Sequence, residues 1–556
     1  MAKTGVIYGI NGPVVSLLGD SGFQMNEMVH VGQEKLVGEV IGLNSEKTTI
    51  QVYEETSGIK PGETVTGTGA PVSVTLAPGI LSNIFDGIER PLSEIAKGSG
   101  YYISRGISVN SLDTDKKWDT HMVVKEGDRI MPGTIIAEVP ETRAITHKVM
   151  APPDAEGYVL TVVPDGRYTI EEPLLTLQLM DGTERTLTMT QKWPIRVARP
   201  SARRFPAVKP LITGQRILDT MFPLAKGGTA AIPGGFGTGK TMTQHQVAKW
   251  SDADVIIYIG CGERGNEMTQ ALEEFSELLD PKSQQPLMNR TILIANTSNM
   301  PVAAREASLY SGLTLAEYYR DMGYNVAIMA DSTSRWAEAL RELSGRLEEM
   351  PAEEGFPAYL ASRLSAFYER AGMMQNMNGT EGSVTIIGAV SPQGGDFSEP
   401  VTQNTKRFVR CFWGLDKNLA YARHFPAIQW LTSYSEYLID LSGWYETNVD
   451  KSFVEYRNRL VMLLNQESSL MEIVKLIGAD ILPEDQKLII ETAKLFRVGF
   501  LQQNAYHPID TYVPLDKQLR MMELMLKLYH GAKDIVSRAI PEIDGFKPSH
   551  RKLLYT

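Results

Sequence analysis

The amino-acid sequence predicts a multidomain α/β protein. It has a β-barrel at the N-terminus, a central parallel sheet flanked by helices, a β-rich domain inserted into that central part, and a helical domain at the C-terminus. Short β-like runs separated by Gly, Asn and Asp fill residues 1–70, as is typical of small barrels. From about residue 205, apolar strands alternate with longer helical stretches, as in βαβ units around a parallel sheet. After about residue 435 only helical patterns remain.

The expected elements follow this order along the chain. In the barrel, strands are expected at 4–8, 13–18, 28–31, 36–43 and 48–53. In the central part, strands are expected at 254–259, 291–295, 325–330 and 383–390, and helices at 267–279, 301–322 and 334–349. C-terminal helices are expected at 452–480, 484–500 and 515–537. The predicted domains are therefore the barrel at 1–70, the α/β domain at 71–110 and 191–435, the β-rich insertion at 111–190 and the helical domain at 436–556.

Composition narrows the class of protein. A chain of 556 residues is too long for one domain. The net charge of −11 argues against a surface that coats nucleic acid, so no nucleic-acid partner is expected. No apolar stretch approaches the roughly 18 residues of a membrane span, and the first residues lack the apolar core of a signal peptide. Cys261 and Cys411 are the only cysteines, which fits a reducing compartment. We expect a cytoplasmic protein that reaches a membrane only through partners.

One motif predicts a nucleotide site. It is a phosphate-binding loop of the pattern G-x-x-x-x-G-K-[ST], preceded by a short apolar run and followed from Met242 by a helical stretch. Its glycines let backbone N–H groups converge on phosphate oxygens. Lys240 is expected to reach the β- and γ-phosphates, and the Thr241 hydroxyl to bind Mg²⁺. A chance glycine-rich turn is the alternative, and both flanking segments argue against it. The loop residues are Gly234, Gly235, Phe236, Gly237, Thr238, Gly239, Lys240 and Thr241.

Acidic residues follow two of the expected strands, on the side where α/β sheets bind ligands. Glu263, just past the strand at 254–259, is placed to polarise a water beside the γ-phosphate. Arg264 could hold phosphate or brace Glu263, and a surface salt bridge is the alternative for the pair. Asp331 ends an apolar strand in the Walker-B pattern, which holds Mg²⁺. Asp331 could also cap the helix that follows, and Arg335 could face the phosphates or pair with Asp331.

Two further groups are weaker candidates. Gln393 follows the strand at 383–390 and could sense the γ-phosphate, although a simple turn fits equally well. The aromatic loop segments Phe425-Pro426 and 502–506 could form walls of an adenine pocket, because purines stack on aromatic rings. For a single Phe or Tyr, packing in the core is the alternative.

The motifs GGFGTGKT, GCGERGNE, ADSTSRWAEALRE and SPQGGDFSEP, in this order, resemble the catalytic A subunit of V-type and archaeal-type (V/A-type) rotary ATPases. The resemblance covers essentially the whole chain and implies a RecA-like nucleotide domain. It implies that Lys240 and Thr241 contact phosphate and Mg²⁺, that Glu263 activates water and that Arg264 binds phosphate. Supporting residues would be Glu267, Arg335 and Gln393, and the adenine would be held by Phe425, Pro426, Gln503, Ala505 and Tyr506.

The same resemblance implies a large assembly. Three such chains would alternate with three B subunits in a ring, and each B subunit would supply an arginine finger in trans. A central rotor shaft, a peripheral stalk and an ion-translocating membrane sector would be built by other subunits, at the cytoplasmic face of the cell membrane. ATP and ADP would be substrate and product, Mg²⁺ the cofactor, and H⁺ or Na⁺ the transported ion. The chain length favours a bacterial or archaeal source.

Three other classes are disfavoured by particular features. Secretion and flagellar export ATPases lack an insertion like 111–190. A hexameric RNA-translocating motor would need an aromatic and basic strand-binding surface, whereas residues 1–70 contain only Tyr8, Phe23 and Tyr53 as aromatics. A non-catalytic ring subunit would not need Glu263 beside an intact phosphate loop. The function expected is ATP hydrolysis or synthesis coupled to ion translocation.

Overall fold

The computed structural model describes residues 3–100, 103–281 and 283–538. Two compact units make up the chain. The first contains the chain up to residue 206, together with 226–233 and 253–409. The second contains 207–225, 234–252 and the chain from residue 410 onward. No helix in the described ranges is both long enough and apolar enough to cross a membrane.

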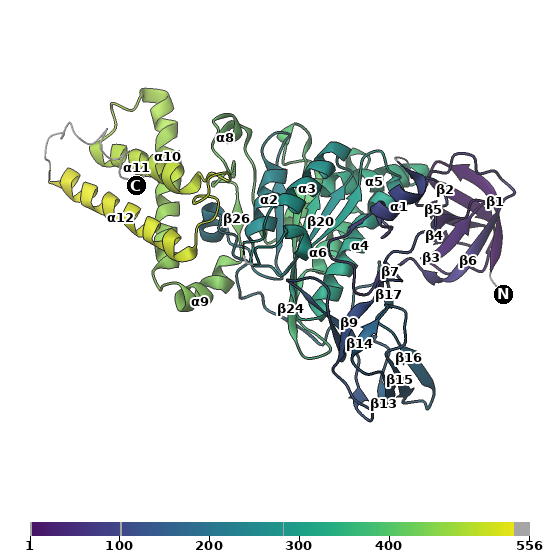
Figure 1. Cartoon of the computed structure of the whole chain (residues 1–556). Helices are drawn as coiled ribbons and strands as arrows, with labels where there is room; N and C mark the ends of the chain where they lie inside the picture. Colours follow the sequence, from purple (N-terminus) through teal and green to yellow (C-terminus); the bar gives the residue numbers. More distant parts are fainter. Residues whose placement is uncertain (1–2, 101–102, 282, 539–556) are drawn as a thin grey trace. The chain divides into compact units, whose positions relative to one another are not determined.

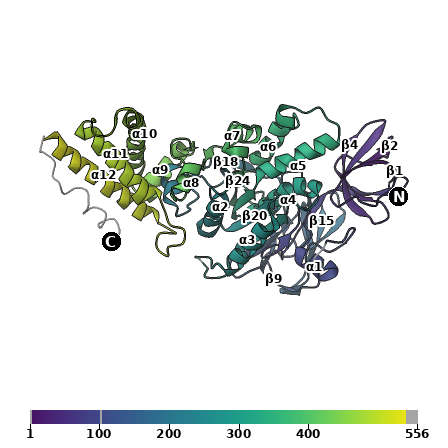
Figure 2. The same ribbon diagram turned by 90° about the horizontal axis from the view of Figure 1, so that it is seen from above.

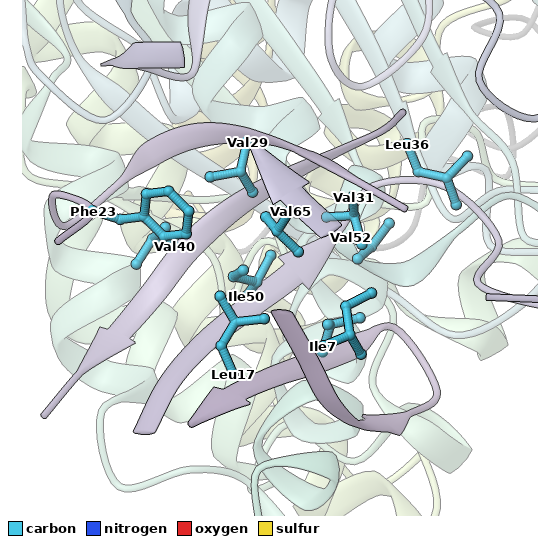
Figure 3. Close-up of a cluster of buried hydrophobic side chains, with 11 residues drawn as sticks. Ile7, Leu17, Phe23, Val29, Val31, Leu36, Val40, Ile50, Val52 and Val65 are labelled. Atoms are coloured by element: carbon cyan, nitrogen blue, oxygen red, sulfur yellow. The ribbon is translucent and has the colours of Figure 1, made fainter. Parts of the chain in front are cut away.

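The N-terminal strands of the first unit form a closed barrel in the order β1-β2-β5-β4-β3-β6. Alternate side chains point inward and pack in its centre, as the period of two along a strand requires (Figure 3). The strand that sequence reasoning did not anticipate is β6, whose segment TVTGTGAP carries few bulky residues. It pairs with β1 and β3 and so closes the barrel. The strands are β1 Thr4–Asn11, β2 Val14–Leu18, β3 Glu27–Val31, β4 Leu36–Leu43, β5 Lys47–Val52 and β6 Thr64–Pro71.

A second β-rich region of the first unit contains two four-stranded sheets, in the orders β10-β13-β15-β16 and β12-β11-β9-β14. It is preceded and followed by the two strands of a small antiparallel pair, β7 (Ser73–Leu76) and β17 (Gln191–Pro194). The remaining strands are β9 Trp118–Met122, β10 Arg129–Ile130, β11 Ile135–Pro140, β12 Thr146–Met150, β13 Gly157–Val162, β14 Gly166–Tyr168, β15 Leu175–Leu179 and β16 Glu184–Leu187.

Buried polar contacts join this β-rich region to the long helix α4 (Val302–Asp321). His147 Nδ1 lies 2.8 Å from a carboxylate oxygen of Glu141. The other ring nitrogen of His147 lies 2.9 Å from the hydroxyl of Tyr318. Tyr319 donates to Glu141 at 2.9 Å. Because buried polar groups are costly when unpaired, this network fixes the β-rich region against α4.

The α/β part of the first unit has parallel strands in the order β19-β24-β22-β20-β21-β8. Every residue of β20 and β21 is buried, which explains why these strands appear in the sequence as continuous apolar runs. Helix α4 packs on β20, β21, β22 and β24. The strands are β8 Ile84–Phe85, β19 Thr229–Pro233, β20 Val255–Cys261, β21 Thr291–Asn296, β22 Asn325–Asp331 and β24 Glu381–Val390, with β23 Gly372–Gln375 and β18 Arg203–Phe205 paired antiparallel beside β24.

Five further helices belong to the first unit, and Figure 1 shows α3 and α5 beside β20. They are α1 Leu92–Ser99, α3 Gly265–Glu277, α5 Thr333–Arg346, α6 Leu360–Glu369 and α7 Pro400–Phe408. Short 3₁₀ turns occur at Leu287–Arg290, Glu353–Gly355 and Gln393–Gly395.

The second unit is mainly helical. Its long helices α10, α11 and α12 contact one another and lie side by side (Figure 2). Helix α10 ends earlier than the predicted residue 480, because Gly478 adopts a positive φ of 87° that stops the helix. Its helices are α2 Lys240–Trp250, α8 Lys417–Tyr421, α9 Leu438–Asn448, α10 Phe453–Ile477, α11 Glu484–Phe496 and α12 Leu515–Ser537, with π-turns at Ile217–Met221 and Arg497–Leu501 and a hairpin of β25 (Cys411–Phe412) and β26 (Tyr434–Ser435). The predicted fold class is confirmed.

Candidate functional site

The phosphate-binding loop lies in the second unit and leads into helix α2. Gly239, the residue before α2, has a left-handed φ of 92°. Having no side chain, it leaves the first backbone N–H groups of the helix to a ligand or water. A Cβ on Gly234 would lie 2.6 Å from the Thr238 hydroxyl, so this position accepts only glycine. Thr238 donates to the carbonyl of Gly235 at 2.7 Å, and the Lys240 ammonium donates to the carbonyl of Gly234 at 3.1 Å. The loop therefore has an internally braced, anion-binding geometry.

Two aromatic side chains of the same unit lie beside this loop and helix. The ring of Phe425 lies 3.8 Å from where a Cβ of Gly239 would be, and Phe425 is 42% exposed. Tyr506 is 82% exposed, and its hydroxyl lies 3.7 Å from the Met242 sulfur in the first turn of α2. Exposed aromatic rings beside a phosphate loop provide flat apolar surfaces on which a purine can stack.

Gln503 has a different environment from these two rings. Its side chain is buried and donates to the carbonyls of Gly214 at 2.9 Å and Asp510 at 2.7 Å. It also accepts from the Arg216 backbone N–H at 2.8 Å. Its own backbone N–H donates to the Phe425 carbonyl at 2.8 Å. In this structure Gln503 therefore acts on the aromatic surface by holding Phe425, while the next predicted positions, Ala505 and Pro426, are half-buried.

The acidic candidates lie in the first unit, at one edge of the sheet. Strands β20 and β22 are parallel neighbours, and Gly260 lies opposite Asp331. Both strands therefore end together, which brings the segment after β20 close to Asp331. Glu263 is half-buried, and its carbonyl accepts from the Ser298 backbone N–H at 2.9 Å. Exposed Arg264 precedes helix α3, and Glu267 lies in the first turn of that helix.

Arg335 and Arg305 surround the backbone before Glu263. A Cβ on Gly262 would lie 2.7 Å from the Arg335 Cβ, and Gly262 has a φ of 72°, so the chain passes closely under this helix. Arg335 forms an ion pair of 2.8 Å with Glu338. The hydrogen bond from Glu338 raises the pKa of Arg335, and the charges of Glu263 and Glu267 act in the same direction. The guanidinium of Arg305 donates to the Ser298 carbonyl at 3.0 Å.

Asp331 is a buried carboxylate, only 3% exposed. The hydroxyl of Tyr258 donates to its Oδ2 at 3.1 Å. Burial, followed by the charge of Asp331, raises the pKa of Tyr258 well above its usual value, so this hydroxyl keeps its proton. Helix α5 is preceded by Ser332, so Asp331 lies one residue before the cap position.

Two outcomes complete the comparison with the sequence predictions. Gln393 is exposed and begins a 3₁₀ turn, which matches the turn alternative for its segment. Tyr258 and Arg305 were not anticipated as part of the site. A tyrosine inside an apolar strand and an arginine inside a long helix carry no local signal, and their contacts depend on the pairing of distant segments.

Family models match the chain along most of its length. The ATP synthase alpha/beta family β-barrel domain matches residues 7–69, and the alpha/beta barrel-sandwich domain of that family matches 109–196. The family's nucleotide-binding domain matches 214–435. The C-terminal domain of V and A type ATP synthases matches 442–543. The fold, the phosphate loop and these matches define a nucleotide-binding protein of the ATP synthase alpha/beta class.

Individual relatives narrow this class. The V-type ATP synthase alpha chain of Halothermothrix orenii is 60% identical over 97% of this chain and 92% of the relative. The V-type ATP synthase alpha chain 2 of Clostridium tetani is 61% identical over 97% of this chain and 90% of the relative. The catalytic-head chain of the A-type ATP synthase of Methanopyrus kandleri, its A subunit, is 57% identical over 97% and 91%. The chain belongs to the family of V-type ATP synthase alpha chains and A-type ATP synthase A subunits. It is an ATP-hydrolysing or ATP-synthesising enzyme component whose turnover is coupled to ion translocation, as the sequence predicted.

Proposed function

We propose that this chain performs Mg²⁺-dependent ATP turnover with a defined division of roles. The loop 234–242 and Lys240 bind the phosphates, and the aromatic surface of Phe425 and Tyr506 holds the adenine. Glu263 orients and activates the attacking water, and Arg264 binds the γ-phosphate. The observation that carries this proposal is the phosphate loop itself, with left-handed Gly239 opening helix α2 and the exposed ring of Phe425 beside it.

The chemistry of two side chains fits Mg²⁺. Mg²⁺ prefers hard oxygen ligands, and it usually takes one or two protein side chains together with phosphates and water. The Thr241 hydroxyl, in the first turn of α2, and the buried Asp331 carboxylate are such ligands. When bound, the ion neutralises charge on the transferring phosphoryl group.

The residues of this chain supply the other steps. Lys240 places a positive charge on the phosphates. Glu263 accepts a hydrogen bond, and then a proton, from the water that attacks the γ-phosphate. The hydrogen bond from Ser298 to the Glu263 carbonyl fixes the backbone of this residue. Arg264 and Arg335 add positive charge on the same segment. In-line transfer needs positioning and charge stabilisation more than covalent chemistry.

Membership in this family places the chain in a multisubunit complex. We propose that its direct neighbours are B-type subunits in an alternating hexamer, each supplying an arginine finger in trans. Central rotor subunits, a peripheral stalk and a membrane sector that moves H⁺ or Na⁺ complete the assembly. The complex works at the cytoplasmic face of the cell membrane. We further propose domain limits at 1–70, 71–110 with 191–435, 111–190 and 436–556.

The test is the substitution Lys240→Ala. Removing the ammonium should weaken ATP binding and turnover together, because its charge acts in the ground state and in the transition state. Lys249→Ala is the matched control, since it removes a lysine from the same helix about 14 Å away, at 1.5 Å of rise per residue. Equal ATP affinity for Lys240→Ala and wild type, measured by titration calorimetry, would show that the loop does not bind phosphate.

A further inference from the structure

A buried tyrosine contacts the carboxylate that we assign to Mg²⁺. Tyr258 lies in β20 and Asp331 ends the neighbouring strand β22. The tyrosine is only 2% exposed, and its hydroxyl donates to Asp331 Oδ2 at 3.1 Å. Its ring packs edge-on against Phe275 of helix α3, with the ring centroids 5.6 Å apart. The hydroxyl is therefore held in place by the strand on one side and by the helix on the other.

This contact constrains how Asp331 can turn. A free carboxylate rotates about its last side-chain bond with little resistance, because that torsion has a broad profile. A hydrogen bond to Oδ2 from a group that is itself packed removes that freedom. The phenol has an ordinary pKa near 10, so it is a donor at neutral pH. Partners of this kind orient metal-binding carboxylates, and their loss typically costs about 10–100-fold in metal affinity or activity.

The same chain contains a comparable contact without a metal-binding role. Tyr319 in helix α4 is buried and donates to the buried carboxylate of Glu141 at 2.9 Å. That pair joins the inserted β-rich region to α4. Removal of either hydroxyl deletes one buried tyrosine–carboxylate hydrogen bond, so the two substitutions share any general cost to stability.

We propose that Tyr258 is a positioning residue for Mg²⁺, which holds the Asp331 carboxylate in the orientation that the ion requires. The proposal rests on the function proposed above, in which Asp331 contributes to Mg²⁺ binding. Tyr258 does not touch the nucleotide in this proposal and acts only through Asp331. Its loss therefore weakens binding of the ion while leaving the metal-free binding of nucleotide unchanged.

The test compares Tyr258→Phe, Tyr319→Phe and wild type in the assembled enzyme complex. Mn²⁺ replaces Mg²⁺ as a spectroscopic probe, and bound Mn²⁺ is measured in the presence of ADP by electron paramagnetic resonance. Tyr258→Phe should weaken Mn²⁺ binding by about 10-fold or more, whereas Tyr319→Phe should bind Mn²⁺ as wild type does. ADP affinity in EDTA should be the same for all three proteins. In an Asp331→Ala background, Tyr258→Phe should have no further effect on Mn²⁺ affinity.

Each outcome has a clear meaning. Equal Mn²⁺ affinity for Tyr258→Phe and wild type would refute the positioning role. An equal loss in Tyr319→Phe would also refute it, because the effect would then be one of general stability. If the wild-type complex binds Mn²⁺ no better with ADP than without it, the proposed Mg²⁺ function itself fails, which is a different result from failure of Tyr258 alone.

Discussion

Replacement of Phe425 by alanine should weaken nucleotide binding much more than it weakens the fold. Phe425 is 42% exposed, so a stacked adenine has a substantial ring face left to cover. A phenylalanine side chain contributes roughly 200 Å² of surface, which leaves about 80 Å² for the nucleotide to bury. At about 25 cal/mol per Å² this surface corresponds to about 2 kcal/mol, within the range of about 1–3 kcal/mol for base–aromatic stacking. The expected loss in affinity is about 30-fold.

The assay pairs two measurements on each variant. ADP affinity is measured by titration calorimetry, and the thermal midpoint is measured without nucleotide. Phe425→Trp keeps an aromatic face and should bind ADP nearly as well as wild type. Phe453→Ala is the control for a packing role, because Phe453 is buried in the same unit and stacks on Tyr445 at 4.6 Å. That control should lose about 3–5 kcal/mol of stability and keep its ADP affinity.

The opposite pattern would contradict this reasoning. If Phe425→Ala lowers the thermal midpoint as much as Phe453→Ala does, and leaves ADP affinity intact, then Phe425 is a packing residue. The adenine would then be held by other groups, and the exposed ring beside Gly239 would have no part in binding.

Three further predictions concern catalysis, pH and assembly. Glu263→Gln should keep ADP affinity and lose about 10²–10⁴-fold in turnover; more than a tenth of wild-type turnover in the assembled complex would contradict its role. Burial, followed by the charge of Arg497, lowers the pKa of His424 to about 4, so the folded chain resists protonation there and should lose stability as the pH falls from about 6.5 towards 4. His424→Gln should flatten that part of a pH–denaturation profile, and an unchanged profile would contradict this cause. The purified chain should hydrolyse ATP slowly, and a B-type partner should raise turnover by about 10³–10⁵-fold if it supplies an arginine finger; full turnover by a verified monomer would refute the finger in trans.

The central strands and helices could be predicted closely because their sequence patterns are local. Strand β20 was expected at 254–259 and spans Val255–Cys261, and helix α4 was expected at 301–322 and spans Val302–Asp321. Continuous apolar runs and flanking Pro or Gly residues mark such elements. Strand β6 was not predicted, since its Thr- and Gly-rich sequence becomes a strand only by pairing with β1 and β3.

The loop residues of the site were predictable for a similar reason, and their contacts were not. The phosphate loop is one continuous motif, and the ends of β20 and β22 indicate where acidic residues meet the sheet edge. The bond between Tyr258 and Asp331 depends on the pairing of two strands that are 73 residues apart at these positions. The ion pair of Arg335 with Glu338 was also not foreseen, because both alternatives considered for Arg335 involved other partners.

The aromatic surface of the second unit is held in place before any nucleotide binds. Gln503 donates its backbone N–H to the Phe425 carbonyl and accepts from the Arg216 backbone N–H. Arg216 in turn pairs with Asp510, in contact through its Nη1 at 2.5 Å. These bonds tie segments near residues 216, 425 and 503–510 together, so Phe425 does not need to be ordered by the ligand. Because ordering of loops and side chains on binding costs free energy, a surface fixed in advance leaves more of the stacking energy available for affinity.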